Sequence, residues 1–271
     1  MDKISEESKH QKDKEELLKS KIKDKIKIAQ NKNRYMDTDF LDLREQEIIK
    51  NEIIKNRYQN IILYGGHESS ERKVLIVYTE KYEYILENIY NEVLNIIRIQ
   101  NPKEYYKKYD HRTYLGALIK LGIKREKIGD IIVKENGADI ICKSNISKFI
   151  ASNINTLTRF QKSKITIENI SDLEYNEPEK QIFKIIVQSM RLDSIIAELA
   201  NTSRNKAQEL IQQERVFVNF KEELRASLKI EENSYITIRG KGRFKINKIL
   251  NTTKSGRIVI EIENNKRGKY E

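Results

Sequence analysis

Tryptophan is absent from this chain of 271 residues, and thiols, imidazoles and prolines are scarce, with one Cys, three His and two Pro. The lone Cys142 cannot form a disulfide within the chain, which is typical of a protein from a reducing cytoplasm. The few Cys and His residues are scattered, so no cluster of metal ligands is visible. No apolar run approaches the ~20 residues that span a bilayer, and the hydrophilic start is unlike a signal peptide. We therefore expect a cytoplasmic protein without metal, cofactor or membrane insertion.

Charged residues are plentiful, and the positive ones are in excess. The chain has 52 Lys and Arg against 41 Asp and Glu, a formal net charge of +11. Because 38% of the residues are hydrophobic, the chain can still bury a core, and its length suits two or three small domains. The basic excess favours an anionic partner, but the abundance of Lys, Ile and Asn also fits a bias in genomic base composition. Clustering of charge is therefore the stronger signal.

The most informative stretch covers residues 191–246. Apolar residues recur at i, i+3, i+4 and i+7 in Leu192–Leu199, which predicts one buried face of a helix. Ser203 follows a short turn and is placed to cap a second helix. The alternation in residues 216–218 predicts a strand, and Asn219 begins a turn.

Positive side chains gather on this scaffold where a phosphate would bind. Arg204 and Lys206 fall in the first turn of the second helix, where free backbone N–H groups and the helix dipole attract an anion. Residues 239–248 then carry five cations and no acid, interrupted by two glycines that let backbone approach a ligand closely. We expect these cations to converge on one face. The candidate contacts are Arg191, Ser203, Arg204, Lys206, Asn219, Arg239, Lys241, Arg243 and Lys245.

Together these elements resemble the S-four-type RNA-binding domain, a small module also called alpha-L and named after a ribosomal protein. The matching residues are Arg191-Leu192-Asp193, Ser203-Arg204, Ala207, Leu210-Ile211, Val216, Val218 and Asn219. The family usually has glycine at the place of Glu214 and Gly-Asp at the place of Asn233-Ser234, both of which are turn positions. The resemblance implies that structured RNA is bound through phosphate and sugar, because A-form RNA hides its base edges from side chains.

The lysine-rich segment 1–34 is expected to form a basic arm, flexible or helical. Leu18, Ile22 and Ile26 recur at every fourth residue, which allows a helix. The apolar stripe is narrow and has neither Trp nor Phe, so a helix lying on a membrane surface is disfavoured. A solubilising tail is the favoured role of this arm, and the alternative is a flexible arm that contacts RNA phosphates or a negatively charged membrane.

Residues 35–84 are expected to form a small α/β domain. A helix capped by Asp37 or Thr38 would be followed by strands at residues 60–64 and 73–78. His67 comes directly after two glycines. We expect it in an exposed polar turn rather than a catalytic site, because no nucleophile or second base accompanies it.

Residues 85–178 alternate strand and helix signals in the order β-α-β-β-α-β. This order predicts an α-β plait, the architecture of the common RNA-recognition fold. The aromatic RNP1 pattern is missing from the central strand at residues 138–142, so bases are not expected to stack on this sheet. Lys124 and Arg125 lie in a basic loop and are further candidate RNA contacts.

An acidic, proline-containing linker separates this domain from the RNA-binding domain, which we expect at residues 181–262. A charged tail at residues 263–271 follows it. The predicted fold class is therefore α+β, with three small domains: the N-terminal α/β domain, the RRM-like plait and the S-four-type domain.

From about Phe40 onward the chain also resembles the YlmH family of bacterial proteins. The likeness is carried by FLDLREQEI from Phe40, GGHESSERK from Gly65, HRTYLGALIKLGIKREKIGDIIV from His111 and RLDSIIAELANTSR from Arg191. It implies a cytoplasmic RNA-binding protein without enzymatic activity. It further implies binding to the large ribosomal subunit with an obstructing peptidyl-tRNA, in ribosome-associated quality control. The expected partners are rRNA, tRNA and the large subunit, bound by a monomer.

Two other functions stay open at this point. S-four-type modules are often appended to pseudouridine synthases, which use a catalytic Asp beside an Arg-Leu-Asp motif, and Arg191-Leu192-Asp193 fits it superficially. Here that motif opens a helix of the binding module, and no large second sheet domain remains for catalysis. The glycine-rich segments also match neither G-x-G-x-x-G nor the P-loop. The second alternative is an adaptor at the membrane or division site, suggested only by the charged arm.

Overall fold

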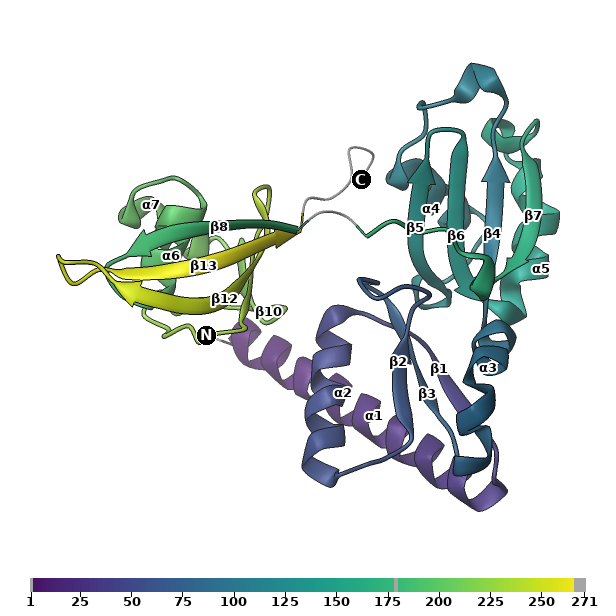
Figure 1. The fold of residues 1–271 in the computed structure, drawn as a ribbon, viewed down its shortest axis with the longest axis horizontal. Coiled ribbons are helices and arrows are strands. Elements are labelled where there is room, and N and C mark those ends of the chain that lie inside the picture. The colour runs from purple at the N-terminus through teal and green to yellow at the C-terminus, as the bar shows by residue number, and fades with distance from the viewer. Residues whose placement is uncertain (1, 178–179, 266–271) are drawn as a thin grey trace. The chain divides into compact units, whose positions relative to one another are not determined.

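The computed structural model describes residues 2–177 and 180–265. The chain forms two compact units, one within residues 1–176 and one within residues 177–268, and each is described by itself (Figure 1). In the described part of the chain, no helix combines the length and the apolar character needed to cross a membrane.

The first unit begins with a three-stranded sheet flanked by two helices. Its elements are α1 (Asp2–Lys32), β1 (Met36–Leu41), α2 (Leu43–Asn56), β2 (Ile61–Tyr64) and β3 (Lys73–Val77). The strands are antiparallel in the order β1-β3-β2. The predicted helix start at Asp37 or Thr38 is wrong, because these residues lie in β1. Asp42 caps α2 by accepting from the Glu45 N–H, and the Glu45 side chain accepts from the Asp42 N–H, so a capping box sets this boundary.

Helix α1 contributes to the core of the first unit. Ile22, Ile26 and Ala29 are buried and belong to one apolar cluster with Leu41 of β1 and Ile49 of α2. Their spacing of four and three residues places them on one face of the helix. The helix that the sequence allowed is present, but its second half packs into the core and does not form a free arm. Residue 1 and the side chains of residues 2–11 lie outside what the structure describes.

The rest of the first unit is a four-stranded sheet with two helices on one face. Its elements are η1 (Glu80–Ile85), α3 (Leu86–Val93), β4 (Leu94–Gln100), η2 (Lys103–Tyr105), α4 (His111–Lys120), η3 (Arg125–Lys127), β5 (Ile128–Lys134), β6 (Gly137–Lys143), α5 (Ser144–Asn153), η4 (Ile154–Thr156), η5 (Thr158–Phe160), β7 (Lys164–Asn169) and η6 (Ile170–Asp172). Neighbouring strands are antiparallel in the order β5-β6-β4-β7. Helices α4 and α5 pack on one face of this sheet, so the predicted plait is confirmed.

The opposite face of the plait sheet is covered by the small sheet. Ile96 and Ile141 of the plait pack with Phe40 and Val74 of the small sheet, all of them buried. A Cβ atom on Gly129 of β5 would lie 2.7 Å from the Phe40 ring, so the two layers are in close contact. The face on which RNA-recognition folds stack bases is therefore closed. The first two predicted domains share this core and form one compact unit.

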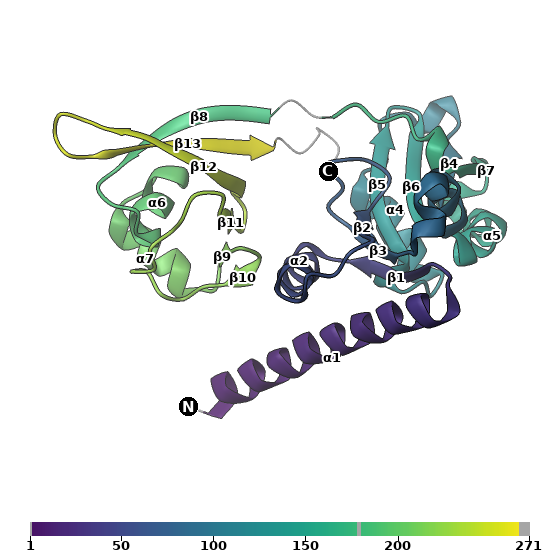
Figure 2. The same ribbon diagram turned by 60° about the horizontal axis from the view of Figure 1, so that its bottom comes forward.

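The second unit is a six-stranded antiparallel sheet with two helices on one face (Figure 2). Its elements are β8 (Lys180–Val187), α6 (Leu192–Leu199), α7 (Arg204–Gln212), β9 (Val216–Val218), β10 (Lys221–Glu222), β11 (Tyr235–Ile238), β12 (Gly242–Thr252) and β13 (Ile258–Asn265). The strand order is β10-β9-β11-β12-β13-β8. Apolar residues of both helices and of five strands form one core. Of the tail predicted at residues 263–271, the first three belong to β13 and the rest lie outside the described residues.

Candidate nucleic-acid interface

Helix α7 begins at the surface of the second unit with an N-cap and two cations in its first turn. The Ser203 hydroxyl accepts a hydrogen bond from the Lys206 N–H at 3.3 Å, the capping geometry that the sequence predicted. Arg204 and Lys206 are exposed. Ala207 and Ile211 of the same helix are fully buried in the core, so apolar packing holds this basic first turn in place at the surface.

Arg204 is connected to Arg191 through the carboxylate of Asp193. Arg191 donates to both Asp193 oxygens, from Nε at 3.2 Å and from Nη2 at 3.0 Å. Arg204 Nη2 and Gln208 Nε2 also donate to this carboxylate, at 3.1 and 3.2 Å. The Asp193 side chain is fully buried, whereas the Arg191 and Arg204 side chains are 41% and 44% exposed. One internal acid thus holds two surface arginines next to each other at the starts of α6 and α7.

Asp193 is ionised at neutral pH despite its burial. Burial alone raises the pKa of Asp193, but hydrogen bonds from Arg191, Gln208 and Arg204 outweigh it and bring the pKa to about 2. Both arginines are therefore engaged in carboxylate pairs within the molecule, which the sequence did not reveal. A single carboxylate neutralises only one of the two positive charges, and the exposed part of each guanidinium faces solvent. With Lys206, the surface at the helix starts keeps an excess of positive charge.

The cations of β12 and of the turn before it lie toward the other side of the sheet. Ile238 and Phe244 point into the core beneath the helices. Because side chains alternate along a strand, Arg243 points to the opposite face, which we call the open face. Arg239 follows the last residue of β11, and its guanidinium lies 4.9 Å from the centroid of the Phe217 ring. Cross-strand pairing of Arg243 with Thr237, and of Thr237 with Phe217, puts those residues on the same open face. The expectation that all the cations converge on one face is therefore wrong.

Two cations of the glycine-interrupted run also lie at or near this open face. Lys241 is exposed in the turn between β11 and β12, where Gly240 and Gly242 adopt positive φ angles of +82° and +122°. Glycine takes these angles without a steric penalty. Lys245 is half-buried and lies opposite Glu263 of β13, so an acid offsets part of its charge.

Asn219, a predicted RNA contact, has a structural role in the turn between β9 and β10. Its Oδ1 accepts a hydrogen bond from the Tyr235 N–H at 2.9 Å, and its own N–H donates to the Tyr235 carbonyl at 2.8 Å. The residue has a φ of +47°, a conformation that Asn tolerates better than most residues. The Asn219 side chain therefore fixes the turn.

The two candidate RNA contacts in the basic loop of the plait, Lys124 and Arg125, differ in the direction in which their side chains point. Lys124 is exposed. Arg125 is turned inward, and its Nη1 donates to the carbonyl oxygens of Ile128 and Gly129 at 2.6 and 3.3 Å. Burial lowers the pKa of Arg125 to about 10. In this geometry Arg125 contacts the backbone of its own chain, whereas Lys124 is the exposed cation of the loop.

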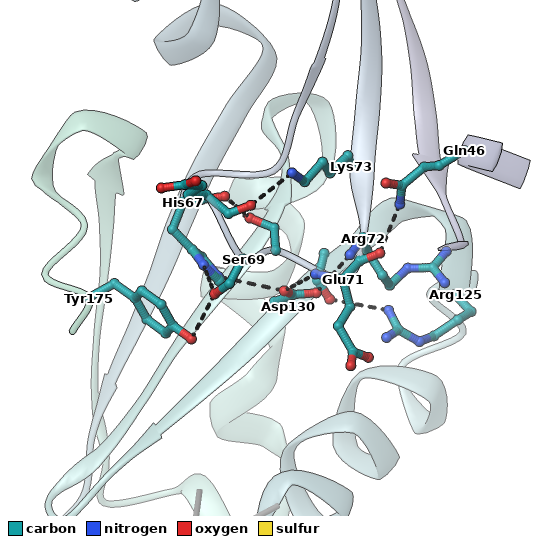
Figure 3. Close-up of polar contacts among 12 residues, drawn as sticks. Gln46, His67, Ser69, Glu71, Arg72, Lys73, Arg125, Asp130 and Tyr175 are labelled. Atoms are coloured by element: carbon teal, nitrogen blue, oxygen red, sulfur yellow. Dashed lines mark hydrogen bonds and ion pairs between the residues drawn. The ribbon is translucent and has the colours of Figure 1, made fainter. Parts of the chain in front are cut away.

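A second polar cluster, in the first unit, surrounds the loop after β2 (Figure 3). His67 Nδ1 lies 3.2 Å from the Ser69 hydroxyl, and His67 Nε2 lies 3.5 Å from the Asp130 carboxylate. The imidazole ring stacks on Tyr175 with centroids 3.7 Å apart. Because the His67 side chain is only 8% exposed, the prediction of an exposed polar turn is wrong for His67, although the neighbouring Glu68 is exposed.

This cluster has the residue types of a catalytic triad, but its groups are used to hold the loop. The Asp130 carboxylate accepts hydrogen bonds from the backbone N–H groups of Glu71 and Arg72 at 2.7 and 3.1 Å (Figure 3). The Tyr175 ring covers the imidazole of His67, where a substrate would have to approach a catalytic base. The cluster therefore fastens the loop to β5 and to the end of the first unit.

Comparison with known proteins shows which family this chain resembles. Residues 90–174 match the family described as "Putative RNA-binding domain in YlmH", and residues 190–234 match the S4 domain. The chain is 32% identical over 242 residues to "Ribosome-associated protein quality control protein P2" of Bacillus subtilis (strain 168), covering 89% of this chain and 91% of that protein. The chain belongs to the YlmH family. The solved structure of "Cell division protein ylmH from Streptococcus pneumoniae" matches 59% of this chain and 93% of its own, with a TM-score of 0.46 and 16% identity.

In this YlmH-family protein, the sequence located the basic residues of the S4 domain but missed their partners. Gln208 and Asp193 meet across two helices, so no local spacing reveals their contact. Phe217 and Phe220, which underlie Arg239 and Arg243, were also missed. A signal for Phe217 was available, because Val216 and Val218 on either side of it pack against the core, and alternation then places Phe217 on the open face.

Proposed function

We propose that this chain is a non-catalytic RNA-binding protein that binds the large ribosomal subunit carrying peptidyl-tRNA, in translation quality control. The S4 domain supports structured RNA as the ligand. The name of the Bacillus subtilis relative supports a ribosome-associated setting. The observation that carries the proposal is the Arg191–Asp193–Arg204 cluster beside the capped start of α7.

This cluster is suited to grip a phosphate backbone. The start of α7 offers N–H groups and a positive dipole end, and Arg204 and Lys206 add charge at the same place. A guanidinium can bind two phosphate oxygens with parallel hydrogen bonds. Because Asp193 already fixes the arginines, less side-chain entropy is lost when RNA binds.

Asp193 serves in this function as a structural acid rather than a catalytic one. A pseudouridine synthase needs an aspartate that reaches the base, whereas Asp193 is fully buried and accepts hydrogen bonds from three side chains. The adaptor alternative rested on a free charged arm, and the second half of α1 is packed into the core.

Salt titration of RNA binding tests the proposed function. If about four to six phosphates are contacted, log K should fall against log salt with a slope of roughly −3 to −5. Replacing Arg204 and Lys206 by Gln should make this slope shallower by about 2. The same variant should co-sediment poorly with large ribosomal subunits in sucrose gradients.

A matched control removes two charges elsewhere in the second unit. Lys254 and Arg257 are exposed near the turn between β12 and β13, and their replacement by Gln should leave subunit co-sedimentation nearly unchanged. Equal losses in both double variants would mean that net charge, rather than the start of α7, governs binding. A slope near zero for the unmodified protein would remove the basis of the proposal.

A further inference from the structure

The hairpin between β9 and β10 carries an aromatic residue in a conformation that favours glycine. Lys221 pairs with Val218, so Asn219 and Phe220 form a two-residue turn. Their φ angles are +47° and +64°, and positive values at both positions are typical of a type I′ turn, whose preferred pair is Asn-Gly. A bulky residue in this region costs roughly 1 to 2 kcal/mol. The Phe220 side chain therefore stands at a place where the backbone disfavours it.

The Phe220 ring packs with Tyr235 and Arg243 outside the apolar core. Its centroid lies 5.2 Å from that of Tyr235, at an interplanar angle of 30°. The Arg243 guanidinium lies 5.5 Å from the Phe220 centroid. A second pair of the same kind stands nearby, with the Arg239 guanidinium 4.9 Å from the Phe217 centroid. Two planar cations, each backed by an aromatic ring, thus occupy the open face.

Charge on this part of the surface is mainly positive. Arg215 donates from Nη2 to the Arg239 carbonyl at 3.0 Å, which brings a further cation to the same edge. Lys241 is exposed in the adjoining turn. Against these cations stand Glu222, which pairs across from Phe217, and Glu263 on β13. The surface therefore favours an anion, and its flat groups favour a planar one.

We propose that the open face binds an unpaired nucleotide of RNA. The base stacks on the Phe220–Arg243 pair, and Arg239 and Lys241 bind the flanking phosphates. Stacking on aromatic rings and on guanidinium planes is the usual way in which proteins hold bases splayed out of loops and bulges. A base inside an A-form duplex cannot reach such a platform. This inference rests on RNA being the ligand, and it adds a preference for a loop or bulge over plain duplex.

The test compares two RNA probes, a blunt duplex and the same duplex closed by an adenosine-rich loop containing 2-aminopurine. Phe220→Gly in the full chain removes the ring and places glycine after Asn219, the pair that a type I′ turn prefers. The melting temperature of this variant should therefore be equal to or higher than that of the unmodified protein. Affinity for the looped RNA should fall about tenfold, because one base–aromatic stack is lost. Affinity for the duplex should change less than about twofold.

Arg243→Lys provides a second variant that keeps the charge and loses the flat guanidinium. It should also weaken the looped RNA selectively, whereas Phe220→Trp should keep the affinity and the quenching of 2-aminopurine on binding. Equal losses for both probes, or no loss for either, in Phe220→Gly and Arg243→Lys would overturn the inference. Failure of the proposed function has a different signature, because the unmodified protein would then bind neither probe in a salt-dependent way.

Discussion

Among single residues, Asp193 is predicted to influence both stability and the candidate interface. Its pKa of about 2 in the folded protein lies below the ordinary value of 3.8. Because the folded pKa is the lower one, the stabilisation is fully present above about pH 4 to 5 and is lost as the pH falls towards about 2. A difference of this size corresponds to roughly 2 kcal/mol at neutral pH.

Asp193→Asn, which cannot ionise, is the matching variant. We expect its urea unfolding free energy to lie below that of the unmodified protein at pH 7, and the gap to shrink to about half near pH 3. Circular dichroism is the suitable signal, since the chain has no Trp. A gap that does not change between pH 7 and pH 3 would show that the carboxylate charge contributes nothing.

Glu214 is a second residue for which the direction of the change in unfolding free energy on substitution can be predicted. It follows α7 with a φ of +59°, at a position where S-four-type domains usually have glycine. Glu214→Gly removes the left-handed strain of roughly 1 to 2 kcal/mol, offset by about 0.5 to 1 kcal/mol of backbone entropy. We expect a gain of up to about 1 kcal/mol in unfolding free energy.

Glu214→Ala is the control for this effect, because it removes the carboxylate but keeps the Cβ atom. Its unfolding free energy should stay within about 0.5 kcal/mol of the unmodified protein. An equal gain in both variants would assign the effect to the lost charge instead of the backbone conformation.

At the residue scale, sequence reasoning found side chains but not their partners. Arg204 was placed correctly in the first turn of a capped helix because capping and helix periodicity are local. Its pairing with Asp193 depends on how α6 meets α7, and the inward turn of Arg125 depends on the carbonyl groups that β5 exposes. Neither contact can be predicted from the local sequence.

At the scale of elements, α1 should stabilise the first unit. Ile22→Ala, at a position that is 1% exposed, should lower the unfolding free energy by about 2 to 5 kcal/mol. Leu17→Ala on the same helix, at a position that is 55% exposed, should change it by less than about 0.5 kcal/mol. Chemical unfolding of both variants tests this, and an Ile22→Ala protein as stable as Leu17→Ala would mean that α1 is a dispensable tail.

Two glycines, Gly65 in the loop after β2 and Gly116 in α4, should respond in opposite ways to substitution by alanine. A Cβ on Gly65 would lie 2.4 Å from the Arg72 carbonyl oxygen, whereas a Cβ on Gly116 in α4 would meet nothing within 4 Å. Gly65→Ala should therefore destabilise by about 1 to 3 kcal/mol, and Gly116→Ala should stabilise by about 0.5 to 1 kcal/mol. Melting temperatures should move in opposite directions, and a shared direction would contradict the packing described for the loop.

Most elements could be predicted because their signals are periodic and short-range, as in α6, where the apolar spacing of Leu192–Leu199 predicts the helix. The failure at residues 36–41 has an identifiable cause. The expected helix start at Asp37 or Thr38 would place Phe40 and Leu41 inside the helix that follows them. They form a strand because β3 pairs with them, and that tertiary contact outweighs local preference.

At the scale of the whole molecule, the order of elements was enough to predict the plait, but not what covers it. Burial of Ile96 and Ile141 under the small sheet joins segments that lie far apart in the sequence. The closed face removes the usual base-stacking surface of such folds from the first unit. The second unit, with an S4 domain and two basic surfaces, is therefore the part that we expect to contact RNA.

Ultraviolet cross-linking of the full chain to cellular RNA, with mapping of the joined peptides and nucleotides, tests this expectation most directly. We expect cross-links from peptides containing Arg191 to Lys206 and Phe217 to Lys245, joined to RNA of the large ribosomal subunit or to tRNA. Cross-links confined to peptides of residues 1–176, or none above background from the second unit, would contradict it.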